Sequence, residues 1–138
     1  MDRHRIIRLV GVSKYVSHQE NQALYECGQR AFGENKVQDL SYKSQTLESL
    51  PLEWHFIGNL HSNKINALLT LKPFMFHSVH SLSLANELQK RLERENLTLK
   101  TLLQINSAKE TTKSGFNPES AYESYLQIQE TCPNSKLC

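Results

Sequence analysis

Short apolar runs alternate with longer amphipathic stretches along the whole chain, which is the pattern of an α/β protein. Each run is rich in β-branched and aromatic residues and is bounded by polar residues or turn formers. Each therefore predicts a short buried strand. The five predicted strands are 6–12, 30–35, 53–58, 73–79 and 99–106.

Helices are predicted between these strands from their capping residues and apolar spacing. Ser17 and Glu20 form a capping box at the start of the first helix, and Gly28 supplies a left-handed stop after it. Ser83 is the expected N-cap of the most amphipathic helix, and Asn117 is that of the last. The predicted helices are 17–28, 36–48, 62–70, 83–92 and 117–133.

Five strand–helix units in succession indicate a parallel sheet with helical crossovers, for which two layouts compete. A doubly wound sheet usually carries a glycine-rich phosphate-binding turn, and none of the five glycines forms one. A barrel places its chemistry where its strands end, and polar residues collect there in this chain. The fold class expected is therefore a (β/α)8 barrel, of which a chain of 138 residues holds only about the first five β/α units.

Composition narrows the functional classes. No apolar stretch approaches the roughly 20 residues of a membrane span, and the net charge of +2 comes from scattered basic residues, so neither a membrane nor a nucleic acid is an expected partner. The odd count of three cysteines, with no C-x-x-C pair, favours free thiols in a cytoplasmic location. His77 and His80 lack the further ligands of a metal site, so none is expected. We expect one domain over residues 1–138.

Lys14 is the first candidate for chemistry, because it follows a buried strand directly. A lysine amine attacks an aldehyde only when unprotonated, and exclusion of water at a barrel mouth favours that form. The sequence thus predicts a shielded amine suited to Schiff-base formation, with pyridoxal 5′-phosphate the commonest aldehyde cofactor. An ordinary solvated loop lysine is the alternative.

Asn35 ends the second strand and could bind a ring hydroxyl or cap the following helix. His55 is expected to be buried with its ring nitrogens satisfied.

Five segments together resemble the pyridoxal phosphate homeostasis protein family. They occur in the same order and with similar spacing, and they cover nearly the whole chain. The segments are VSK at 12–14, GQRAFGENKVQ at 28–38, LEWHFIGNLHSNK at 52–64, HSVHSLSLA at 77–85 and LLQINSAKETTKSGF at 102–116.

This resemblance implies a fold-type III pyridoxal phosphate protein, similar to the barrel domain of alanine racemase. It implies that Lys14 carries the cofactor as a Schiff base and that Asn35 lies beside it. Ser78 and Asn106 are implied as pocket neighbours, and Lys113 as an accessory group. Members are monomers with no established catalytic activity, and are thought to buffer the free cofactor. A racemase-like enzyme and a non-functional fragment are the alternatives.

The resemblance also implies that this chain is truncated. The family's N-terminal helix and C-terminal units are absent, and NSKLC at 134–138 resembles the start of a sixth strand. An incomplete barrel leaves strand edges open, so we expect self-association through those edges. We also expect weak retention of the cofactor.

Overall fold

The computed structural model describes residues 6–138 as a single sheet of six parallel strands arranged in sequence order. A doubly wound sheet reverses its strand order at a switch point, whereas sequential order is the arrangement of a barrel. The predicted partial barrel is therefore confirmed, with a sixth strand at the end of the chain. The strands are β1 (Gly11–Val12), β2 (Ala31–Glu34), β3 (Glu53–Phe56), β4 (Met75–Val79), β5 (Leu99–Leu103) and β6 (Ser135–Leu137).

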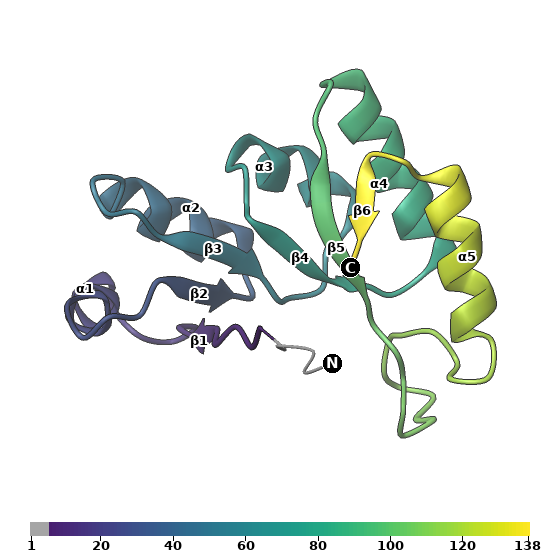
Figure 1. Ribbon diagram of the computed structural model, residues 1–138, viewed down its shortest axis with the longest axis horizontal. Coiled ribbons are helices and arrows are strands. Elements are labelled where there is room, and N and C mark those ends of the chain that lie inside the picture. The colour runs from purple at the N-terminus through teal and green to yellow at the C-terminus, as the bar shows by residue number, and fades with distance from the viewer. Residues whose placement is uncertain (1–5) are drawn as a thin grey trace, which may run out of the picture.

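The helices lie around the outside of the curved sheet (Figure 1). They are α1 (His18–Glu26), α2 (Val37–Thr46), a 3-10 turn η1 (Ser62–Lys64) continued by α3 (Ile65–Thr70), α4 (Leu82–Arg94) and α5 (Ala121–Thr131). Within residues 6–138 no helix covers the concave face of the sheet. That face is open, whereas the convex face carries the core.

The predicted ends of the first helix are confirmed. The Ser17 hydroxyl accepts a hydrogen bond from the Glu20 amide at 3.3 Å, and the Glu20 carboxylate accepts one from the Ser17 amide at 2.7 Å. Gly28 has a φ of +102°, the left-handed conformation expected of a helix stop.

Several other boundaries differ from the prediction, and three of these differences have a visible cause. The N-cap of α4 is Ser81 rather than Ser83, because the Ser81 hydroxyl accepts from the Leu84 amide at 3.1 Å. Asn117 caps only a turn, in which its side-chain oxygen accepts from the Glu119 amide at 3.0 Å, and α5 begins at Ala121. β1 has two residues instead of seven. As an edge strand it pairs only with β2, so its apolar side chains find few partners.

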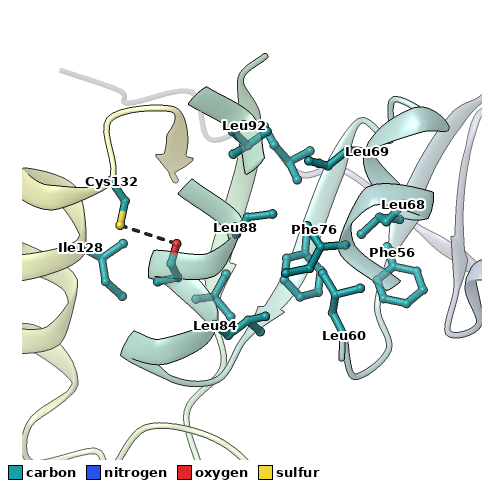
Figure 2. Close-up of a cluster of buried hydrophobic side chains, with 14 of the residues drawn as sticks. Phe56, Leu60, Leu68, Leu69, Phe76, Leu84, Leu88, Leu92, Ile128 and Cys132 are labelled. Atoms are coloured by element: carbon teal, nitrogen blue, oxygen red, sulfur yellow. Dashed lines mark hydrogen bonds between the residues drawn. The ribbon is translucent and has the colours of Figure 1, made fainter. Parts of the chain in front are cut away.

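The core lies between the sheet and helices α3, α4 and α5. Phe56 and Phe76 are in register on β3 and β4, with ring centroids 5.8 Å apart. Figure 2 shows these rings facing the leucines of α3 and α4, with Ile128 of α5 and Cys132, which follows α5, beyond. Burial of these side chains is the main stabilising contribution, since removal of apolar area from water dominates folding. It fixes the strands whose ends form the candidate site.

Candidate functional site

The carboxyl ends of all six strands meet at one edge of the sheet because every pairing is parallel. Lys14 lies two residues beyond β1, and Asn35 follows β2, the adjacent strand. Ser78 lies in β4 and Asn106 lies beyond β5, which are also neighbours, while β3 separates the two pairs. The structure thus places all four predicted site residues at one end of the sheet, in two pairs separated by β3.

Lys14 lies in a tight turn from Ser13 to Val16, closed by a 3.3 Å hydrogen bond from the Val16 amide to the Ser13 carbonyl. Its side chain is exposed, so the prediction of an amine shielded from water is wrong for the residues described. The reason is that β1 is an edge strand: among residues 6–138 it has β2 on one side and no strand on the other. The predicted position at a strand end is confirmed.

Asn35 is half-buried, and its side-chain oxygen is buried without a hydrogen-bond partner. The alternative role as helix cap is wrong, because the N-cap of α2 is Lys36. The Asn35 side chain therefore remains free to bind another group. It lines a cavity of about 320 Å³ together with Asn59, His61 and Lys64.

Ser78 and Asn106 are both engaged in hydrogen bonds with main-chain carbonyls. The buried Ser78 hydroxyl donates to the Ile57 carbonyl at 3.3 Å, beside a β-bulge where the register of β4 against β5 shifts. The Asn106 side-chain amide nitrogen donates to the carbonyls of Glu110 at 2.7 Å and Lys113 at 3.2 Å. These bonds hold the strand-end loops in place, so both residues shape the edge of the site in this structure.

A pair of histidines on the concave face was not anticipated from the sequence: His55 is buried and His77 is half-buried. His55 Nδ1 is 2.8 Å from His77 Nε2, whereas His55 Nε2 has no hydrogen-bond partner. The expectation that both ring nitrogens of His55 are satisfied therefore holds for Nδ1 only. Burial, followed by the neighbouring His77, lowers the pKa of His55 to about 4. Burial also lowers the pKa of His77. Both rings are therefore neutral at pH 7.

A second buried polar cluster was also missed, formed by Ser13, Glu34 and Lys43. Two signals in the sequence could have revealed it. Glu34 is a carboxylate at the end of the otherwise apolar run Ala31–Gly33, and Lys43 is three residues from Leu40, on the same face of its helix. A charge at a buried position is rarely found without a partner of opposite sign.

Within residues 6–138, no three His, Cys, Asp or Glu side chains lie closely enough together to hold a metal ion. Over the same residues, no helix has both the length and the apolar character needed to cross a bilayer. The three cysteines are free thiols.

The sequential parallel sheet with a lysine at its first strand end defines a protein of the α/β-barrel class. Comparison with known proteins then shows which family the chain resembles. The chain is 57% identical over 135 residues to the pyridoxal phosphate homeostasis protein of Helicobacter pylori, covering 98% of this chain and 61% of that protein. It is 38% identical over 130 residues to the homologue of that name in Aquifex aeolicus, covering 94% and 56%. Over nearly its whole length the chain is similar to members of the pyridoxal phosphate homeostasis protein family, as its motifs indicated.

These relatives are named for cofactor homeostasis and not for a catalysed reaction. The chain spans about three fifths of the length of the first curated relatives it matches. No family model matches it.

Solved structures agree with this assignment. PipY of Synechococcus elongatus without pyridoxal phosphate aligns with a TM-score of 0.83 at 30% identity, covering 95% of this chain and 60% of PipY. The structure of PipY with pyridoxal phosphate bound aligns with a TM-score of 0.80. Alanine racemase of Clostridium difficile aligns with a TM-score of 0.79 at 14% identity, over 95% of this chain and 34% of the racemase. At that identity the racemase supports the fold alone.

Proposed function

We propose that this chain binds pyridoxal 5′-phosphate through a Schiff base on Lys14 and acts in homeostasis of that cofactor. The observation that carries the proposal is the position of Lys14 at the end of β1, beside the end of β2, where Asn35 presents a buried oxygen without a partner. The cofactor supplies an aldehyde, and Lys14 is a primary amine at the sheet edge where barrel proteins place their chemistry.

The residues present fit the cofactor in two respects. The exposed amine of Lys14 is accessible to an aldehyde from solution. The free amide oxygen of Asn35 can accept a hydrogen bond from a hydroxyl group, and a buried acceptor without a donor is costly to leave unpaired. Ser78 and Asn106 would contribute to the pocket mainly by holding the neighbouring loops. The free thiols support a reducing compartment such as the cytoplasm.

The test is to incubate the purified chain with pyridoxal phosphate, reduce it with borohydride and map the modified peptide. We expect the label on Lys14 and its loss in Lys14→Arg, which keeps the charge but cannot form the Schiff base. Lys100→Arg is the matched control, because Lys100 is an exposed lysine on β5. Equal labelling of several lysines, unchanged in Lys14→Arg, would refute the proposal.

The same purified protein and its Lys14→Arg variant also distinguish a role in homeostasis from catalysis. The racemase-like alternative predicts steady turnover of an amino acid by the loaded protein, abolished in Lys14→Arg. The homeostasis proposal predicts reversible uptake and release of the cofactor without turnover. No contact among residues 6–138 favours the enzyme over the binding protein.

A further inference from the structure

A buried ion pair lies directly behind the turn that carries Lys14. Lys43 Nζ on α2 is 2.5 Å from Glu34 Oε1 on β2, and their side chains are 6% and 0% exposed. The Ser13 hydroxyl donates to the same carboxylate oxygen at 2.6 Å, and Lys43 Nζ donates to the Ser13 carbonyl at 2.7 Å. Both the side chain and the carbonyl of the residue preceding Lys14 are therefore held by one ion pair.

Every polar atom of Ser13 is bonded. Besides the two contacts with the ion pair, its amide donates to the Gly33 carbonyl at 3.0 Å and its carbonyl also accepts from Val16. The turn that follows contains a strained residue, since Tyr15 has a φ of +70°. A left-handed conformation is unfavourable for a residue other than glycine, because its Cβ crowds the following carbonyl oxygen. The Tyr15 side chain is 80% exposed, so packing of its ring offsets little of that cost.

The energetics argue for a role beyond stability. Removing two charges from water is costly for each ion, and their attraction repays that cost only when the geometry and further hydrogen bonds are favourable. Apolar residues of similar volume would often stabilise a buried position as well or better. The ion pair instead fixes the orientation of Ser13, because both of its charged groups are hydrogen-bonded to that residue.

We infer that Lys43 and Glu34 are positioning residues for Lys14. They hold the end of β1 so that the Ser13–Val16 turn presents the Lys14 amine in one orientation. The ion pair acts through Ser13 and does not touch the cofactor. This inference rests on the proposed function of Lys14, and its test separates the two.

The test uses the double variant E34Q/K43M. The amide oxygen introduced at position 34 would still accept from the Ser13 hydroxyl, while the bond from Lys43 to the Ser13 carbonyl is lost. The double change leaves the net charge unaltered and leaves no buried charge unpaired. K90M is the matched control, since Lys90 forms an exposed ion pair with Glu87 on α4.

Three measurements are made on the full chain: urea unfolding, spectroscopic titration with pyridoxal phosphate, and amide hydrogen exchange of Ser13 without cofactor. We expect at least about a tenfold loss of cofactor affinity in E34Q/K43M, because a displacement near 1 Å can cost up to about 100-fold. The Ser13 amide should exchange faster, while the urea midpoint stays close to that of wild type. K90M should match wild type throughout.

Wild-type cofactor affinity and wild-type Ser13 exchange in E34Q/K43M would overturn the positioning role and leave Lys14 as the cofactor lysine. If wild type takes no label on Lys14, the proposed function fails. The positioning role is then decided by comparing amide hydrogen exchange of Ser13 in cofactor-free E34Q/K43M and cofactor-free wild type. If E34Q/K43M does not fold, S13A replaces it. That variant loses one hydrogen bond to the ion pair, so we expect about a threefold loss of affinity. No loss in S13A would then mean that the cluster serves stability alone.

Discussion

Gly58, just beyond β3, is the position where a single methyl group should damage both the fold and the candidate site. A Cβ added there would lie 2.1 Å from the Asn35 carbonyl oxygen and 2.7 Å and 2.8 Å from its carbonyl carbon and Cα. All three are backbone atoms, which cannot swing aside as a flexible side chain could. Ordinary contact begins at 3.4 Å, so the two segments must separate by about 1.3 Å.

The expected cost of Gly58→Ala follows from that separation. Overpacking a well-filled site typically costs about 1–3 kcal/mol in the free energy of unfolding. Asn35 would move with its backbone, so we also expect pyridoxal phosphate affinity to fall by about tenfold or more. Urea unfolding followed by circular dichroism measures the first effect, and spectroscopic titration measures the second.

Gly11→Ala is the matched control, because the same methyl group there meets its nearest neighbours at 3.5–3.6 Å. We expect its unfolding free energy to stay within about 0.5 kcal/mol of wild type. Equal stability and equal cofactor affinity in Gly58→Ala and Gly11→Ala would refute the reasoning, since it would mean that the ends of β2 and β3 separate without cost.

Three further outcomes are expected. Since the folded state lowers the pKa of His55 from 6.5 to about 4, the unfolded chain binds a proton that the folded chain does not in this window. Stability should therefore fall by about 1–3 kcal/mol as the pH drops from 6.5 toward 4, and His55→Gln should flatten this dependence in urea unfolding. Leu88→Ala should cost about 2–5 kcal/mol because Leu88 is fully buried, whereas Leu24→Ala, at 46% exposure, should change stability by less than about 0.5 kcal/mol. Leu9 is 75% exposed beside the open edge of β1, so sedimentation velocity should show concentration-dependent self-association that Leu9→Lys weakens; a monomer at all concentrations would contradict this.

The elements of the fold were predictable because each is set by local physics. Periodic apolar runs and the Ser17–Glu20 capping box act within a few residues, and the structure has these elements close to the expected places. One error arose because a second serine was nearby: Ser81 and Ser83 flank Leu82, the first residue of α4. The length of β1 was overestimated because an apolar run does not reveal that its strand lies at a sheet edge.

The chain by itself determined the alternation of strands and helices, the order of polar residues at the strand ends, and the motifs that identify the family. These depend on residues close together in sequence. Only the tertiary structure decided that the Lys14 side chain is exposed, that the Asn35 oxygen is unpaired, and that Lys43 reaches the Ser13 carbonyl from 30 positions away. Burial and pairing depend on which strands and helices pack together, and that is settled only when the sheet has formed.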